Sequence, residues 1–124
     1  MGMVRTVAAV FGAVYVVAGL AGFVLVDGGE GVLFGLFDVN ALHNIVHILL
    51  GAILLYGATS TSAALMTTRG VGVVLLLLGI LGIPFPDGFD LVPLGGNDIW
   101  LHLVTGAILL AAGFMGESAE TTAA

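Results

Sequence analysis

Four long apolar segments constrain the fold of this chain more than any other feature of its sequence. They run over about residues 4–26, 41–58, 64–83 and 98–115, and each is close to the roughly 20 residues that an α-helix needs to cross a bilayer. Charged residues make up only 8% of the chain, whereas a soluble domain has about 25% because its surface faces water. We therefore predict an all-α protein, a four-helix transmembrane bundle whose main partner is the lipid bilayer.

Turn-forming residues separate the four segments. Residues 27–31 read Asp-Gly-Gly-Glu-Gly, residues 59–62 are short and polar, and residues 84–88 contain two prolines. Proline cannot continue a helix and disfavours helix in the residue before it, so the third helix is expected to end there. Asn40 and Asn97 stand at the starts of the second and fourth segments, where an asparagine side chain can cap a helix.

The second half of the chain repeats the pattern of the first half. Gly12, Gly19 and Gly22 recur 60 residues later as Gly72, Gly79 and Gly82, and His47 with the run Gly51 to Leu55 recurs 55 residues later as His102 with the run Gly106 to Leu110. The repeat predicts two tandem helical hairpins, at about residues 4–58 and 64–115. They form one membrane domain over residues 1–116, and residues 117–124 are predicted to be a disordered polar tail.

The few basic residues predict the orientation in the membrane. The chain has two arginines and no lysine, and Arg5 and Arg69 lie near the starts of the first and third segments. Basic residues favour the cytoplasmic side, so we predict a multi-pass protein of the cell membrane with both termini in the cytoplasm. The net charge of −6 excludes a nucleic-acid partner, because nucleic acid requires a basic surface.

Polar residues gather at the starts of the second and fourth segments. All three histidines of the chain are there, His43, His47 and His102, together with Asp98. His43 and His47 are four residues apart, as are Asp98 and His102, so each pair lies on one face of its helix. Polar side chains within membrane segments usually point into the bundle and mark functional sites. The sequence therefore predicts a cluster of these four residues near the outer side of the membrane.

This cluster has three interpretations. In the first, the imidazoles donate hydrogen bonds to Asp98 or Asn44 and hold the helices together. In the second, His43, His47, Asp98 and His102 bind a divalent transition metal such as zinc, copper, nickel or iron, either with Asp98 as a ligand or with Asp98 orienting an imidazole. In the third, His47 and His102 are the axial ligands of a b-type haem.

The packing interpretation is the one that the sequence favours, and it predicts a membrane component that is not an enzyme. The chain has no cysteine and no recognisable catalytic set outside the cluster. The alternatives are a metal- or haem-binding redox protein and a subunit of a larger membrane complex or homo-oligomer. Proton or solute movement also stays open.

The polar motifs resemble those of a known family. The run Leu-His-Asn-Ile-Val-His-Ile-Leu-Leu-Gly from Leu42 to Gly51, followed by Asp98, His102 and Gly106 at fixed spacing, is similar to the family named domain of unknown function 4383. The resemblance covers about residues 7–114. It implies a small four-helix membrane protein, and it implies no activity or ligand.

Overall fold

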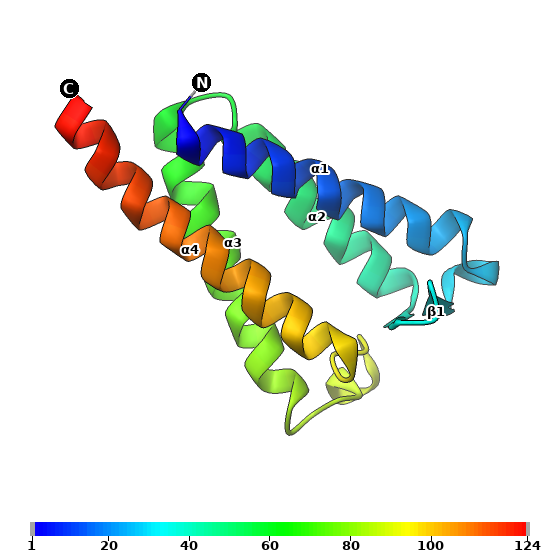
Figure 1. Cartoon of the computed structure of the whole chain (residues 1–124). Helices are drawn as coiled ribbons and strands as arrows, with labels where there is room; N and C mark the ends of the chain where they lie inside the picture. The colour runs from blue at the N-terminus through cyan, green and yellow to red at the C-terminus, as the bar shows by residue number, and fades with distance from the viewer. Residues whose placement is uncertain (1, 124) are drawn as a thin grey trace.

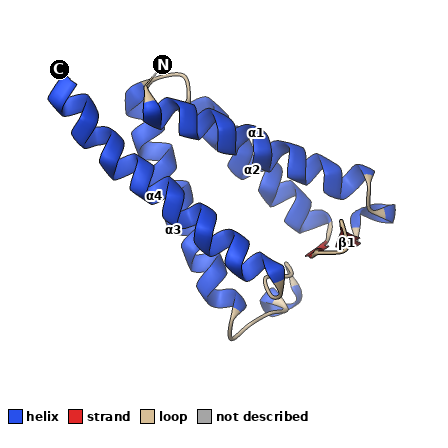
Figure 2. Ribbon diagram, in the orientation of Figure 1, coloured by secondary structure: helices blue, strands red, loops and turns tan. Residues whose placement is uncertain are grey.

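Four helices make up most of the chain, as the apolar segments predict. The computed structural model describes residues 2–123, and side chains over residues 2–116. The helices are α1 (Met3–Val24), α2 (Ala41–Gly57), α3 (Thr61–Gly82) and α4 (Asn97–Ala123) (Figures 1 and 2). The tail predicted at residues 117–124 begins in the part of α4 whose side chains lie outside the described residues, so its disorder stays a prediction.

The helices form two antiparallel hairpins, α1 with α2 and α3 with α4. Figure 1 shows the two hairpins meeting at the end that carries the termini and diverging toward the loop end. Buried apolar side chains fill the middle of the bundle between the hairpins, where Tyr15 and Leu54 of the first hairpin pack with Leu75 and Leu109 of the second. The polar side chains at the starts of α2 and α4 lie toward the diverging end and are buried there.

Glycines allow the two helices of each hairpin to approach closely. A Cβ atom at Gly51 would lie 2.6 Å from the carbonyl oxygen of Gly12 and 2.6 Å from the backbone nitrogen of Val16. In the second hairpin, a Cβ atom at Gly106 would lie 2.9 Å from the carbonyl oxygen of Gly72. Lipid provides no hydrophobic force between helices, so close packing of backbones must supply the attraction.

A short β-hairpin lies between α1 and α2, which the sequence analysis did not predict. Strands β1 (Gly31–Leu33) and β2 (Phe37–Val39) pair antiparallel. The tight turn between them places both Phe34 and Gly35 at positive φ, 55° and 68°, which is the conformation of a type I′ turn. Leu33 and Val39 point inward and are buried, so the hairpin covers the loop end of the bundle.

Two asparagines link the hairpins at the loop end. Asn40 caps α2 as predicted, because its side chain accepts a hydrogen bond from the His43 backbone N–H at 2.8 Å. Its amide also donates to the carbonyl oxygen of Leu91, in the loop before α4. Asn97 donates to the carbonyl oxygen of Leu36, in the β-hairpin. The prediction that Asn97 caps α4 was wrong: Asn97 is the first residue of α4, and its side-chain oxygen accepts from the Trp100 indole N–H.

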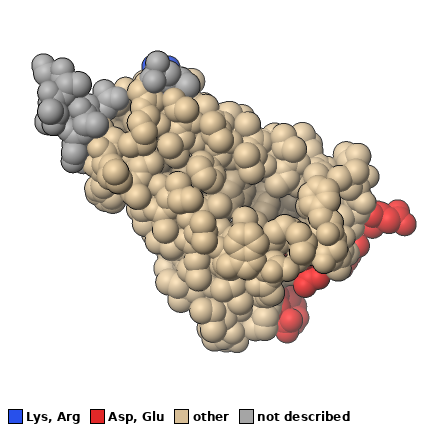
Figure 3. Space-filling view, in the orientation of Figure 1, with Lys and Arg blue, Asp and Glu red and all other residues tan. Residues whose placement is uncertain are grey.

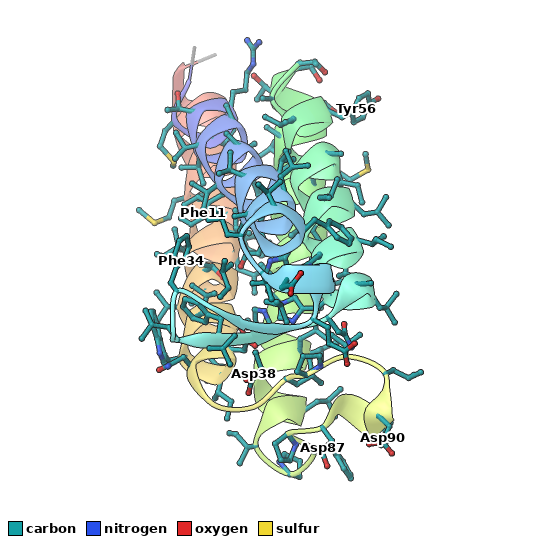
Figure 4. The ribbon with its side chains drawn as sticks, turned by 90° about the vertical axis from the view of Figure 1, so that its right-hand side faces the viewer. Phe11, Phe34, Asp38, Tyr56, Asp87 and Asp90 are labelled. Atoms are coloured by element: carbon teal, nitrogen blue, oxygen red, sulfur yellow. The ribbon has the colours of Figure 1, made fainter. Side chains whose placement is uncertain are left out.

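The surface of the bundle is apolar around its middle and charged at its ends. Among the described residues, three helices are long and apolar enough to cross a membrane, namely α1, α3 and residues Asn97–Gly116 of α4, while α2 is a shorter apolar helix. Acidic side chains gather at the loop end, and arginine appears at the end with the termini (Figure 3). Asp38, Asp87 and Asp90 lie at the loop end and Tyr56 lies at the opposite end (Figure 4). These features indicate a multi-pass membrane protein.

Candidate functional site

The three histidines converge in the interior between the two hairpins. His43 and His47 come from the first two turns of α2, and His102 comes from α4. Their exposed fractions are 2%, 8% and 2%. One ring nitrogen from each histidine can be chosen so that the three nitrogens all lie within 4.8 Å of one another. The structure therefore brings together the imidazoles that the helical spacing placed on facing helix surfaces.

The three histidines of this cluster are not equally spaced. The Nε2 atoms of His43 and His47 are 2.9 Å apart, a hydrogen-bond distance. The rings of His43 and His47 have centroids 4.3 Å apart, whereas the His102 ring lies 6.4 Å from His43 and 6.0 Å from His47. The two histidines of α2 thus form a close pair, and His102 faces them from the other hairpin.

Asp98 is buried beside the cluster but is not one of its closely spaced groups. Its exposed fraction is 1%, and neither carboxylate oxygen has a hydrogen-bond partner among the described residues. It lines a small cavity together with His43 and His47. Of the four residues predicted for the site, the structure therefore gathers the three histidines at ligand distance and places Asp98 in the wall of a cavity that two of them also line.

The hydrogen-bond network expected from the sequence is largely missing. Across the described residues, both ring nitrogens of His102 and the Nδ1 atom of His43 have no hydrogen-bond partner. Asn44 was expected to bond to an imidazole, but its amide donates to the carbonyl oxygen of Gly29 at 3.1 Å. The cluster holds one internal hydrogen bond, between His43 and His47. A buried polar group without a partner costs about 1–3 kcal/mol, so these atoms require a partner such as a water molecule or a bound ion.

Tyr15 belongs to the surroundings of the site, which the sequence analysis did not predict. Its exposed fraction is only 3%. Its ring meets the His47 ring edge-on at 5.1 Å, and its hydroxyl lies 2.7 Å from the Thr105 hydroxyl. Thr105 donates its own hydrogen to the carbonyl oxygen of Leu101, so Tyr15 is the donor to Thr105. Nothing in the local sequence around Tyr15 indicates this contact across the two hairpins.

The site does not fit a haem. The cavity beside the histidines has a volume of about 90 Å³, far smaller than a porphyrin. His47 and His102 have ring centroids 6.0 Å apart, with His43 packed against both. A macrocycle between His47 and His102 would therefore displace His43. The donor set fits a single metal ion instead, because neutral imidazole is a good ligand for divalent transition metals.

The fold and the site together define a class of protein, a multi-pass helical membrane protein with a buried cluster of three histidines. The model of one family, domain of unknown function (DUF4383), matches residues 5–115. The chain belongs to this family, and the resemblance seen in the sequence is confirmed. No curated protein and no solved structure matches the chain significantly.

Proposed function

We propose that this protein binds one divalent transition-metal ion inside the membrane, through His43, His47 and His102. The observation that carries the proposal is the convergence of three buried imidazoles from two hairpins, with ring nitrogens within 4.8 Å of one another. Binding, rather than enzymatic turnover, is the role we propose.

The distances between the imidazole nitrogens support a site in which the ligands shift by small amounts when an ion binds. Metal–nitrogen bonds of about 2.0–2.1 Å in a tetrahedral site place ligand nitrogens about 3.3 Å apart. The His43 and His47 nitrogens, 2.9 Å apart, would separate slightly, and His102 would move inward. Zinc, iron, cobalt, nickel and copper all accept imidazole ligands, and affinity generally rises from iron toward copper.

The unpartnered polar atoms also support an ion over a packing role alone. A metal ion needs a lone pair on one nitrogen of each imidazole, and it would supply the partner that His102 lacks among the described residues. Asp98 carries a carboxylate into the same interior, where its charge would partly balance that of the ion. Helix packing alone, the role that the sequence favoured, gives these atoms no protein partner among the described residues, and an unsatisfied buried polar group costs about 1–3 kcal/mol.

Metal analysis of the purified protein tests this proposal. We expect a near-stoichiometric transition metal in protein purified in mild detergent without a histidine-rich tag, and its loss from each of His43→Phe, His47→Phe and His102→Phe. Phenylalanine keeps a ring of similar size and removes the ligand. Thr68→Val is the control, because Thr68 is buried in α3 and bonds only within its own helix. Equal metal in all variants, or no metal in any, would reject the site and leave helix packing as the role of the cluster.

We also propose that all four helices cross the membrane as two tandem hairpins, with both termini in the cytoplasm. Matching contacts support the repeat: Arg5 of α1 donates to the carbonyl oxygen of Ala58, and Arg69 of α3 donates to that of Gly113. Ala58 and Gly113 are 55 residues apart, the same separation as His47 and His102. The arginines favour the cytoplasmic side for the end with the termini. Partners beyond lipid, such as a second copy or a larger complex, are further proposals.

Cysteine labelling can establish the orientation, because the chain has no native cysteine. Ser62 and Asp87 are both exposed. Ser62 lies in the first turn of α3 and Asp87 lies beyond its last residue, so they are at opposite ends of the bundle. In intact cells, an impermeant maleimide is expected to label Asp87→Cys and to leave Ser62→Cys unlabelled until the membrane is opened. The reverse pattern would invert the proposed topology.

A further inference from the structure

An enclosed cavity of about 90 Å³ adjoins the histidine cluster. His43, His47 and Asp98 contribute its polar side chains, and the rest of its wall is apolar, including Leu33, Phe34 and Leu101. His102 does not line this cavity; together with His43 and His47 it lines a much smaller space of about 10 Å³. Because two of the three histidines also line the larger cavity, an ion held by the three histidines would lie next to it.

A second hollow adjoins this cavity on the lipid-facing surface. A groove of about 390 Å³ runs along α1 and is lined only by apolar residues, among them Val14 and Val17. Those two valines are 55% and 63% exposed, so they would contact hydrocarbon chains in a membrane. Ala18 and Phe34 line both the groove and the cavity, so these two residues separate the lipid from the site.

The acidic end of the molecule is poorly connected to the same cavity. A basin of about 460 Å³ at the loop end is lined by Glu30, Asp38, Asp87 and Asp90, and it shares only Val39 with the cavity. Phe34 lies nearer the middle of the bundle than Asp87 and Asp90 do (Figure 4). A ligand would thus reach the cavity from the membrane, along the apolar groove, rather than from the charged surface.

We infer that the metal keeps one coordination position open toward the 90 Å³ cavity, and that this position binds a small uncharged molecule arriving from the lipid. This inference rests on the proposed metal site. Three protein ligands with a fourth open position are the usual arrangement of reactive metal sites, whereas structural sites are closed by four. The cavity volume equals roughly three water molecules at about 30 Å³ each, which suits a molecule of two or three heavy atoms.

The chemistry of the wall sets the class of ligand. Apolar residues form most of the lining, and Asp98 supplies the acidic group on it. A buried carboxylate disfavours an anion beside it, because like charges repel strongly where water is excluded. A neutral diatomic molecule avoids this repulsion, and it partitions into lipid more readily than a charged molecule does.

Nitric oxide on the iron(II)-loaded protein is a direct probe of the open position. We expect the half-integer-spin EPR signal of an iron–nitrosyl in the wild-type protein, prepared without oxygen, and binding of azide at least about tenfold weaker. Ala18→Leu would fill the cavity and is expected to weaken nitric oxide binding by at least about tenfold at unchanged iron content. Ala9→Leu is the matched control, because it makes the same change on the same helix at a residue that borders none of the described cavities.

A second pair of variants tests the route of nitric oxide from lipid to the cavity. Both variants make a side chain smaller, so the test does not require the fold to accommodate a larger one. Phe34→Ala is expected to speed nitric oxide association several-fold. Phe89→Ala is its control and is expected to leave the rate unchanged, since Phe89 is similarly exposed and also has a positive φ of 60° but lies away from this cavity.

The iron content separates the two ways in which the inference can fail. Iron bound at the histidines with no nitrosyl signal, or with equal binding in Ala18→Leu and Ala9→Leu, would overturn the open position alone. Equal association rates in Phe34→Ala and Phe89→Ala would overturn the route from lipid. A wild-type protein that takes up no iron or other transition metal would overturn both this inference and the proposed function.

Discussion

His102→Phe is expected to abolish the stabilisation that a transition metal gives this protein, while leaving the metal-free protein at least as stable as the wild type. An ion that binds only the folded state stabilises it by about 2.7 kcal/mol when its concentration is 100 times its Kd. The variant loses this increment because one of three ligands is gone. Without metal, the replacement removes a buried imidazole with two unpartnered nitrogens, and an apolar group of similar shape at such a site is often neutral or stabilising.

Thermal unfolding in mild detergent, followed by circular dichroism with and without added zinc, measures both effects. Thr68→Val is the control and should keep the full response to zinc. A zinc-dependent shift in His102→Phe as large as that of the wild type would mean that the ion binds elsewhere, for example at the acidic loop end. A large loss of stability in the metal-free variant would instead favour a structural role for the imidazole.

Gly51→Ala is expected to destabilise the first hairpin by about 1–3 kcal/mol, the usual cost of adding a methyl group to a well-packed interior. The new Cβ atom would lie 2.6 Å from the Gly12 carbonyl oxygen and 2.6 Å from the Val16 backbone nitrogen. Both are backbone atoms, so a side-chain rotation cannot relieve the contact and the helices must separate. Because His47 lies one turn before Gly51 on α2, separation of α1 from α2 should also weaken metal binding.

Gly70→Ala is the matched control for this change. Gly70 also lies within a helix, but a Cβ atom there would meet no described atom within 4 Å. Alanine at an open helical position is favoured over glycine by about 1 kcal/mol, so this variant should be as stable as the wild type or slightly more stable. Unfolding in a denaturing detergent series compares the two, and equal stability of Gly51→Ala and Gly70→Ala would contradict the close packing of α1 on α2.

Features that depend on local periodicity could be predicted from the sequence. Runs of about 20 apolar residues specify membrane-length helices, and the prolines after Gly82 mark the end of α3. The four-residue spacing of His43 and His47 places both side chains on one face of α2, whatever the rest of the chain does. The pairing of His47 with His102 followed from the internal repeat. These parts of the site needed no tertiary information.

Features that depend on contacts across the two hairpins could not be predicted in this way. The hydroxyl of Tyr15 meets Thr105 only when α1 packs against α4 of the other hairpin. The β-hairpin is too short to give a clear alternation pattern, and its turn places Phe34 at a positive φ that favours glycine. The sequence left open whether Asp98 is a ligand or orients an imidazole, and in the structure it is not among the three closely spaced groups.

The sequence by itself determined that lipid surrounds most of the chain, where the helices lie and on which helix faces the polar residues lie. Composition and helical periodicity suffice for this because they are local properties. Only the tertiary structure decided which imidazole nitrogens converge, which polar atoms lack partners and where a cavity meets the lipid-facing groove. These depend on how far the hairpins diverge and on how Asn40 and Asn97 tie their loops together. Such distances are set by side chains far apart in the chain, and no local pattern encodes them.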